Sequence, residues 1–449
     1  MTVDALIDRY LAAQGVRLTD DTATGRRAVA TRRFARGSVI LSLPPLHLLP
    51  ARDGEPDADD RAAELPPTRC THCLDALGAR RARCSQCHVT QYCSSACLAQ
   101  NWSQRHHLLC GGPVARADAL KPAFRATLRM LVGVQRMLTC IARAQGGQGA
   151  VRPAEWMLVQ AAAWRHLQAH RPEHPPYVVK QYEEIAGVAR LNGVDAVDML
   201  CRFGCNNFAA YDWRTGVQAA GQVCSPLASL AFNHSCRPTA LALYDAAAGG
   251  CHVVRALTDI RPGDELTVAY VDALYPRTQR IERLRAVYYF DCQCGRCAGD
   301  GPNACVDRLL DRGVPEDALP AGLPVDLADT PRGPEPWAVA VVDALLDLVL
   351  AEDGRRDELA FERLVAGCIA GTQPRDVSFA AYRHWLECQD DCLDRVAAGA
   401  GGGAPHVVRW AGVAARYVLA FYALAYRPFH PLVARQCLRL AQTVQAAVV

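Results

Sequence analysis

The sequence predicts an α+β protein that binds zinc and ends in an all-helical region. Up to residue 299, short runs rich in β-branched residues alternate with segments of helical periodicity. About half of the 21 cysteines lie at the spacings of metal ligands. Beyond residue 336, apolar residues recur at intervals of three and four. A chain of 449 residues has room for two or three domains of ordinary size.

The composition indicates a globular protein without a strongly charged partner. Apolar residues make up 51% of the chain, charged residues 21%, and the net charge is +3. Such a chain can bury large cores, and its weak net field favours neither nucleic acid nor an anionic membrane. Its first residues lack the pattern of a signal peptide, and the apolar stretch 337–350 is too short to span a bilayer. We expect a soluble intracellular protein.

Strands and a helix are predicted on both sides of the densest group of cysteines. Residues 25–29 and 39–43 are expected to be strands joined by a turn. Residues 156–167 carry apolar side chains at helical spacing. Leu266, Val268 and Tyr270 alternate as they would along one face of a strand. These segments predict a mixed fold around the cysteine group.

Eight potential zinc ligands lie between residues 70 and 110. They form two C-x2-C pairs, one C-x3-C pair and one H-x3-C pair: Cys70, Cys73, Cys84, Cys87, Cys93, Cys97, His106 and Cys110. A C-x2-C turn lets two thiolates face one ion, and residues four apart share one face of a helix. The set suffices for two tetrahedral sites, one with four thiolates and one with three thiolates and an imidazole.

A third zinc site is predicted from cysteines between residues 236 and 297. Cys292, Cys294 and Cys297 supply three thiolates, one fewer than a closed site needs, and Cys236 is the candidate for the fourth. Such a site would fix the segment after Tyr270 against the loop at residues 233–234. We therefore expect three zinc ions in all.

The cysteine group, with Gln91-Tyr92-Cys93-Ser94 and Trp102, resembles a MYND zinc finger. The resemblance implies interleaved ligation, in which the first and third cysteine pairs hold one ion and the remaining four ligands hold the other. One residue more than the usual pattern separates Cys97 from His106, so His107 is a competing ligand. MYND fingers typically bind proline-containing peptides.

The basic run Arg80, Arg81 and Arg83 is interpreted as a solvated loop rather than a nucleic-acid contact.

Phe232-Asn233-His234-Ser235-Cys236 and Gly263-Asp264-Glu265-Leu266, together with the cysteines that follow, resemble the SET domain of protein-lysine methyltransferases. The MYND-like segment inside it is typical of the SET-and-MYND (SMYD) family. The resemblance implies a SET-domain β-fold interrupted by a MYND finger and a helical insert. It assigns residues 1–69 to the first part of the SET domain, 70–110 to the finger, 111–200 to the insert, 201–275 to the core SET domain, 276–299 to the post-SET zinc segment, 300–335 to a linker and 336–449 to a helical, tetratricopeptide-like domain.

The resemblance also implies S-adenosylmethionine as the cofactor and Tyr270 as the catalytic residue. The cofactor-binding residues would be the Asn233 side chain, the His234 backbone, Phe290 stacked on adenine, Asn206, His170, Gly25 and Tyr270. Catalysis would consist of desolvating and aiming a neutral lysine amine, and no dedicated general base is nominated. Taken without the surrounding motif, a tyrosine at a strand end is more often a core residue.

Three departures from the family pattern leave a second function open. Ala23 stands where a glycine is usual, and Ala161 where an aromatic residue is common. Thr239 replaces the asparagine that often follows the Asn-His-Ser-Cys-x-Pro motif. The alternative is a catalytically weak or inactive adaptor that binds proline-containing peptides. The main expectation is a lysine methyltransferase acting on histone or other protein substrates, monomeric, in the cytoplasm or the nucleus, without membrane or direct nucleic-acid binding.

Overall fold

The computed structural model describes residues 3–21, 25–50, 69–79, 81–88, 90–110, 122–146, 153–189, 195–211, 219–299, 304–311, 334–350, 360–361, 363–367, 378–398 and 405–448. The chain divides into two compact units. The first unit comprises Met1–Asn233 and Thr239–Val268, and the second comprises His234–Pro238 and Ala269–Val449. The boundary passes through the Asn-His pair of the SET-like motif.

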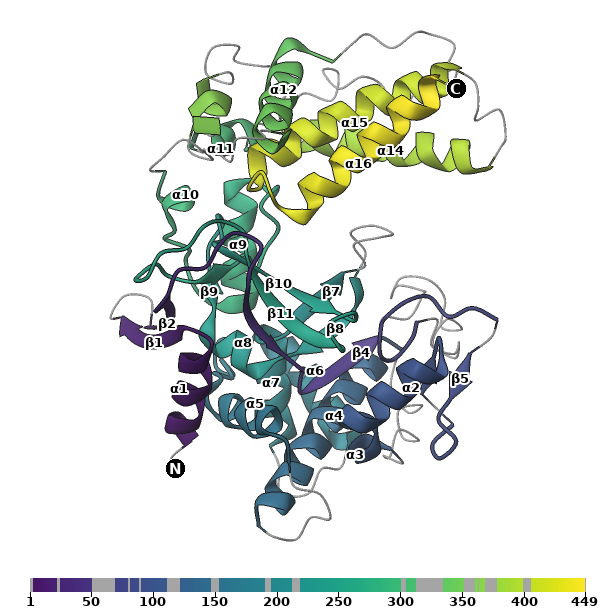
Figure 1. Ribbon diagram of the computed structural model, residues 1–449. Coiled ribbons are helices and arrows are strands. Elements are labelled where there is room, and N and C mark those ends of the chain that lie inside the picture. The colour runs from purple at the N-terminus through teal and green to yellow at the C-terminus, as the bar shows by residue number, and fades with distance from the viewer. Residues whose placement is uncertain are drawn as a thin grey trace. The chain divides into compact units, whose positions relative to one another are not determined.

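The first unit contains both strands and helices (Figure 1). Its strands are β1 (Val16–Asp21), β2 (Gly25–Ala30), β3 (Val39–Leu43), β4 (His47–Pro50), β5 (Ala82–Arg83), β6 (Gln91–Tyr92), β7 (Phe208–Tyr211), β8 (Ala219–Cys224), β10 (Ala240–Asp245), β11 (Cys251–Ala256) and β12 (Thr267–Val268), and the unit boundary falls within β9 (Asn233–His234). Its helices are α1 (Val3–Ala13), α2 (Ser95–Asn101), the π-helix η2 (Trp102–His106), α3 (His107–Leu109), α4 (Pro122–Gln145), α5 (Glu155–His166), α6 (Pro176–Ala189), α7 (Ala196–Cys205) and α8 (Pro226–Ala231).

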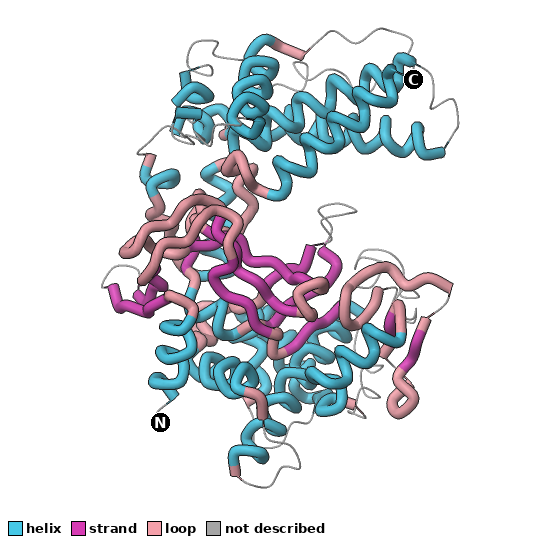
Figure 2. Tube along the Cα trace, viewed as in Figure 1, coloured by secondary structure: helices cyan, strands magenta, loops and turns pink. Residues whose placement is uncertain are grey.

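Several small antiparallel sheets form the β-structure of the first unit (Figure 2). β1 pairs with β2, β3 lies beside β11 in the order β10-β11-β3, and β8 lies between β4 and β7. Strands β3 and β4, close in sequence, thus enter different sheets, and each pairs with a strand far along the chain: Leu43 pairs with His252, and His47 with Cys224. The predicted strands at residues 25–29 and 39–43 are confirmed as β2 and β3.

The strand expected at residues 266–270 is shorter than its alternating pattern suggests. Only Thr267–Val268 is regular, although Leu266 and Val268 are buried as the alternation requires. The residues before it contact β2 without forming a regular strand. Glu265 forms an isolated antiparallel β-bridge with Val29, and the Leu266 amide donates to the Ala28 carbonyl at 2.9 Å. Apolar alternation therefore identified two buried residues but not the length of the regular ladder, and Thr267 between them is buried as well.

The helical part of the first unit has its own apolar core. Residues of α4, α5 and α7 pack together there, and the helix predicted around residues 156–167 is α5. Ala161, where an aromatic residue is common in the family pattern, is 7% exposed in this core. The buried Gln160 amide nitrogen donates to the Pro44 carbonyl at 3.0 Å, and its oxygen accepts from the Leu227 amide at 3.0 Å. These bonds attach α5 to the loop after β3 and to the start of α8.

The second unit is largely helical. Beyond the segment around Tyr270 it contains α9 (Arg277–Tyr288), α10 (Gly295–Ala298), α11 (Ala304–Leu310), α12 (Pro336–Leu350), α14 (Phe379–Ala398), α15 (Pro405–Ala425) and α16 (Pro431–Val448). Helix α15 packs against α12, α14 and α16 (Figure 1). Trp385 of α14 stacks on Tyr417 of α15, with ring centroids 4.2 Å apart and planes 9° apart. The predicted helical periodicity beyond residue 336 is confirmed.

Helix α15 is long and apolar enough to span a membrane, judged by length and composition only. Its segment Val407–Ala425 has a mean hydropathy of 1.3, and 83% of it is buried inside the protein. Burial against neighbouring helices accounts for this composition, as in the central helix of a helical core.

The stretch expected to be a linker contributes one residue to a buried ion-pair network. Helix α11 supplies Asp307, which is 3% exposed and bound by two buried arginines. Both terminal guanidinium nitrogens of Arg280 donate to the Asp307 carboxylate, at 2.9 and 2.8 Å, and Arg296 donates to it at 2.7 Å. The Asp307 carboxylate thus joins α9, α10 and α11. Residues 312–333 of the expected linker lie outside the described residues.

Candidate functional site

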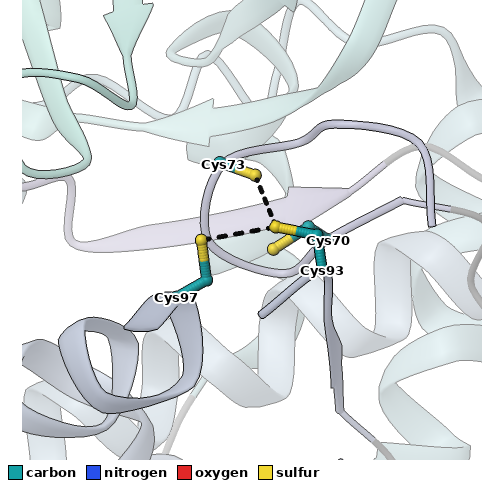
Figure 3. A group of neighbouring side chains, drawn as sticks. All are labelled: Cys70, Cys73, Cys93 and Cys97. Atoms are coloured by element: carbon teal, nitrogen blue, oxygen red, sulfur yellow. Dashed lines mark hydrogen bonds between the residues drawn. The ribbon is translucent and has the colours of Figure 1, made fainter. Parts of the chain in front are cut away.

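The first group of predicted zinc ligands comes together as the interleaved pattern implies. Cys70, Cys73, Cys93 and Cys97 place their sulfur atoms within 4.8 Å of one another, pointing toward a common centre (Figure 3). The Cys93 sulfur lies 3.5 Å from those of Cys73 and Cys97. In a tetrahedral site, zinc–sulfur bonds of about 2.3 Å separate two sulfurs by about 3.8 Å. The spacing of these thiols therefore fits zinc.

The second group contains His106 rather than His107. Cys84, Cys87, His106 and Cys110 place their ligand atoms within 4.8 Å. The Nε2 atom of His106 lies 3.5 Å from the Cys87 sulfur, and the sulfurs of Cys84 and Cys110 are 3.7 Å apart. A tetrahedral zinc bound by one nitrogen and one sulfur would separate the two by about 3.5 Å. The distances fit a site of three thiolates and an imidazole.

A π-helical turn absorbs the additional residue between Cys97 and His106. The helix that begins at Ser95 becomes π-helical over Trp102–His106 and α-helical again from His107. A π-turn contains one residue more than an α-turn, so it realigns the residues that follow with the face used before it. The ring of His107 is directed elsewhere, because its Nδ1 atom lies 2.6 Å from the Trp102 carbonyl oxygen. The backbone thereby selects His106 as the ligand.

The finger is attached to the β-structure of the first unit through buried polar contacts. Tyr244 of β10 donates its hydroxyl to the His72 carbonyl, and the Arg105 guanidinium donates to the Pro45 carbonyl at 3.4 Å. Gly250, after β10, has a φ of +74°, and a Cβ there would lie 2.6 Å from the His72 ring. Only glycine combines this φ with so close an approach.

The third group lies in the second unit, beside Tyr270. Cys236, Cys292, Cys294 and Cys297 place their sulfurs within 4.8 Å, although 56 residues separate the first from the second. The Cys236 sulfur is 3.4 Å from that of Cys297 and 4.0 Å from that of Cys292. These separations again bracket the edge of a zinc tetrahedron. Among the described residues, three groups therefore fit three structural zinc ions.

The side chain of His234 connects Tyr270 to this zinc group. Its Nδ1 atom accepts the Tyr270 backbone N–H at 2.9 Å, and its Nε2 atom lies 3.2 Å from the Cys236 sulfur. Acceptance at Nδ1 requires the proton to sit on Nε2, from which it can be donated to the ligand sulfur. Burial lowers the pKa of His234 to about 4, so the ring stays neutral. Sequence reasoning assigned His234 a backbone role and missed this bond, which no sequence spacing signals.

Tyr270 stands in an aromatic group that packs on the zinc-binding cysteines. Its ring centroid lies 4.8 Å from that of Tyr288, 5.4 Å from His234 and 6.4 Å from Phe290. Tyr270, Tyr288 and Phe290 all contact the cluster of buried cysteines. Burial, followed by the neighbouring Tyr288, raises the pKa of the Tyr270 phenol well above its ordinary value. The hydroxyl therefore remains protonated and can donate a hydrogen bond, but it is a poor base.

A left-handed residue directs the chain from Tyr288 to Phe290. Tyr289 has a φ of 60° and ends helix α9. Glycine usually occupies this position, because a side chain makes the left-handed conformation costly. Because of this turn, Tyr288, the last residue of α9, and Phe290, which follows Tyr289, both lie near the Tyr270 ring.

Asn233 and Gly25 lie together in the first unit. The Asn233 side-chain amide donates to the carbonyl of Arg26, the residue after Gly25, at 2.8 Å. Gly25 has a φ of +71°, and no described atom lies within 4 Å of the position a Cβ would take. The structure thus brings these two predicted cofactor residues together. Ala23 lies outside the described residues.

Asn206 and His170 lie on neighbouring loops. The Asn206 amide donates to the carbonyls of Arg202, at 2.8 Å, and Gln168, at 3.2 Å, which closes α7 and holds the loop that leads to His170. His170 has a φ of 49°, and its Nδ1 atom is 3.9 Å from a carboxylate oxygen of Glu173. Their assignment to cofactor binding stays a prediction.

Thr239 takes part in a hydrogen-bonded pair that sequence reasoning did not foresee. Its hydroxyl accepts the Thr267 amide at 2.9 Å and donates to the Glu265 carbonyl at 3.1 Å, while its own amide donates to the Thr267 hydroxyl at 3.2 Å. This departure from the family pattern therefore still fixes the strand that precedes Tyr270.

The sequence model of the SET domain family matches residues 25–271, which is more than half of the chain. The chain belongs to the SET domain family. The match begins at Gly25 and ends just after Tyr270, so it spans the finger and both SET-like motifs.

Relatives of this SET domain include proteins of the SMYD type. The N-lysine methyltransferase SMYD2-B of Danio rerio is 31% identical over 224 residues, 48% of this chain and 47% of that protein. The histone-lysine N-methyltransferase ASHR1 of Arabidopsis thaliana is 26% identical over 305 residues, 66% of this chain and 57% of that protein. The chain thus matches about half the length of these curated relatives. They support the resemblance to SET-and-MYND proteins.

Among solved structures, the SET domain of LSMT bound to lysine and AdoHcy aligns with 98% of this chain and 93% of its own. The identity is 12% and the TM-score 0.31. Membership of the SET domain family therefore rests on the sequence match.

Proposed function

We propose that this protein is an S-adenosylmethionine-dependent protein-lysine N-methyltransferase. The observation that carries the proposal is the aromatic group around Tyr270, which is held against a zinc-binding cluster in a chain of the SET domain family. The relatives named as lysine methyltransferases support the same reaction.

The residues present fit the cofactor that the reaction requires. Asn233 has a side-chain oxygen besides the amide that binds Arg26, and Gly25 offers an approach without a side chain. Phe290 provides a half-buried ring for stacking. When bound, S-adenosylmethionine supplies an activated methyl group on a sulfonium ion. Asn233, the His234 backbone, Phe290, Asn206, His170 and Gly25 would hold it.

The role of Tyr270 is to orient the substrate amine. Lysine has an ordinary pKa near 10.4, so only about one side chain in a thousand is neutral at pH 7. An apolar aromatic channel favours the neutral amine, because removal of water penalises the ammonium form. The protonated Tyr270 hydroxyl, fixed through its backbone bond to His234, can aim that amine. The ring of Tyr288, whose centroid lies 4.8 Å from that of Tyr270, would line the channel.

Substrate, partner and location are narrower proposals. The substrate is a protein with an accessible lysine, either a histone or another protein. Proline-containing peptides are proposed to bind the finger, and the protein is proposed to be a monomer. Residence in the cytoplasm or nucleus agrees with zinc ligation by thiolates, which a reducing compartment preserves.

A methyl-transfer assay tests the proposed function. Zinc-loaded protein is incubated with radiolabelled S-adenosylmethionine, histones and cell extract, beside Tyr270→Phe and Tyr177→Phe. Tyr177 is 66% exposed on α6 and serves as the matched control. We expect label on a protein band with wild type and Tyr177→Phe, and a loss of at least about 100-fold with Tyr270→Phe. Cofactor binding without transfer in any variant would instead favour the peptide-binding adaptor.

A further inference from the structure

We propose that the C-terminal end of α15 positions Tyr270, with Tyr426 and Arg427 acting as positioning residues for methyl transfer. The inference concerns the second unit alone and rests on the proposed function. It assigns the helical region a role in the reaction itself, in addition to any role in admitting substrates.

The last residue of α15, Ala425, and the two residues that follow it, Tyr426 and Arg427, bind segments near Tyr270. The Tyr426 hydroxyl donates to a carboxylate oxygen of Asp272 at 2.6 Å. The Arg427 Nε–H donates to the Pro238 carbonyl at 2.7 Å. The Ala425 carbonyl accepts from the Arg296 guanidinium at 3.3 Å. One helix end therefore contacts three separate segments of chain.

The first of these segments is the turn that follows Tyr270. Asp272 is two residues beyond Tyr270, and the same oxygen that accepts from Tyr426 also accepts the Leu274 amide at 2.8 Å. The Tyr275 amide donates to the Asp272 carbonyl at 3.3 Å and closes the turn. Tyr426 thus holds a tight turn from outside, at the point where the chain leaves Tyr270.

The second segment carries the group that fixes the Tyr270 backbone. Pro238 is four residues beyond His234, whose Nδ1 atom accepts the Tyr270 amide. Arg296, which is 5% exposed, also donates to the Cys236 carbonyl at 3.5 Å. The helix end therefore restrains both partners of the His234–Tyr270 bond, one through Pro238 and Cys236 and the other through Asp272.

Tyr426 is itself rigidly held. It is 9% exposed, and its ring stacks on His430 with centroids 4.6 Å apart and planes 18° apart. The Tyr422 ring meets it edge-on at 5.5 Å. Burial and the charge of Asp272 raise the pKa of Tyr426 well above its ordinary value, so its hydroxyl stays a donor. A donor on a fixed ring limits how far its acceptor can move, because a hydrogen bond weakens steeply when its distance or angle departs from the favoured range.

Tyr417→Phe is the matched control for Tyr426→Phe. Tyr417 is a buried tyrosine within α15, the helix that ends just before Tyr426, and the Tyr417 hydroxyl accepts the Glu335 backbone amide at 3.0 Å. Each change removes one hydroxyl that bonds outside α15, but only the Tyr426 partner lies next to Tyr270. A purely structural role predicts equal effects of the two variants.

The test measures amide exchange and kinetics in full-length, zinc-loaded protein. Hydrogen–deuterium exchange is followed at residues 269–276, including the Tyr270 amide, and kcat and KM for S-adenosylmethionine are determined. For Tyr426→Phe we expect faster exchange in this segment, a fall in kcat of about 10- to 100-fold, and a KM within about twofold of wild type. For Tyr417→Phe we expect neither change.

Variants of Asp272 supply the rescue. Asp272→Asn keeps an oxygen that can accept from both the Tyr426 hydroxyl and the Leu274 amide, so near-wild-type exchange and kcat are expected. Asp272→Ala should resemble Tyr426→Phe, and the double variant should be little worse than the worse single one.

Unchanged protection of the Tyr270 amide in both Tyr426→Phe and Asp272→Ala would overturn the proposal. Equal loosening by Tyr417→Phe would also overturn it, since the effect would then be general stability. If wild-type protein transfers no methyl group, the proposed function fails, but the exchange measurement still decides whether α15 holds this segment.

Discussion

At the scale of single residues, the choice between His106 and His107 shows how one backbone turn decides metal chemistry. His106 faces three thiols, whereas His107 contacts the Trp102 carbonyl. We expect His106→Ala to bind two zinc ions per chain and His107→Ala to bind three. Metal analysis of purified protein after denaturation measures this. Two ions in His107→Ala and three in His106→Ala would mean that the π-turn does not set the ligand.

His430 makes stability depend on pH. It is buried, its Nδ1 atom accepts the Leu432 amide at 3.2 Å, and burial lowers its pKa to about 4. Its folded pKa lies below the ordinary value of about 6.5, so its neutral form stabilises the fold above pH 6.5. As pH falls from about 6.5 toward 4, the unfolded chain gains a proton that the folded chain does not. His430 then costs up to about 1.4 kcal/mol of unfolding free energy per pH unit.

Urea unfolding at pH 7.5 and 5.5 tests this dependence, with zinc content verified at both values. His430→Asn retains an acceptor for the Leu432 amide but does not titrate, so it should lose about 1 kcal/mol less than wild type between the two pH values. Buried His47 and His252, whose pKa values burial also lowers to about 3, contribute equally to both proteins. An identical loss in wild type and His430→Asn would contradict the assignment.

At the scale of elements, helix α11 joins the zinc segment to α9 through one carboxylate. Burial raises the pKa of Asp307, but the Arg280 bond and the Arg296 charge outweigh it and hold the pKa below its usual value. Asp307→Asn would leave two buried guanidinium groups without a counter-charge and should destabilise the protein by about 3–5 kcal/mol.

Asp311→Asn is the control for that change, because Asp311 is an exposed residue next to the same helix and accepts from Thr278. We expect it to cost less than about 1 kcal/mol. Chemical denaturation of both variants measures the difference. An equal loss of unfolding free energy in the two variants would show that the buried contacts of Asp307 with Arg280 and Arg296 stabilise the protein no more than an exposed contact does.

The elements also show what sequence can and cannot predict. The zinc groups were predictable because most ligands lie within a few residues of each other, and Cys236 was found because three thiolates leave a site incomplete. The bond from Tyr270 to His234 was not predictable, since it joins residues 36 positions apart through the backbone of one of them. Likewise, alternation at residues 266–270 predicts that Leu266 and Val268 are buried, but it indicates neither that Thr267 is also buried nor where the strand ends.

At the scale of the whole molecule, stability comes from two sources that respond differently to chelation. The finger has little apolar core, so zinc must supply much of its folding free energy, on the order of 10 kcal/mol per site. Helices α14, α15 and α16 pack through buried apolar and aromatic side chains, and none of the three metal groups includes a residue from them. A chelator should therefore abolish amide protection in residues 70–110 while α15 keeps most of its protection.

Hydrogen exchange before and after chelation, followed by zinc addition, measures this difference. Methyl transfer should disappear together with the Cys236 zinc group, because Tyr270, Tyr288 and Phe290 pack against it. Simultaneous loss of protection in α15 would show that the helices depend on the metal.

The π-turn also bears on how such fingers are recognised in other chains. Because the turn accommodates an inserted residue while both flanking ligands stay in place, the distance from Cys97 to His106 is free to vary by one. A search pattern with a rigid gap at this point would overlook chains like this one. A pattern that tolerates a single insertion before the histidine would retrieve them. Where two histidines are adjacent, as here, the first is the ligand, because the ring of the second points away from the thiols.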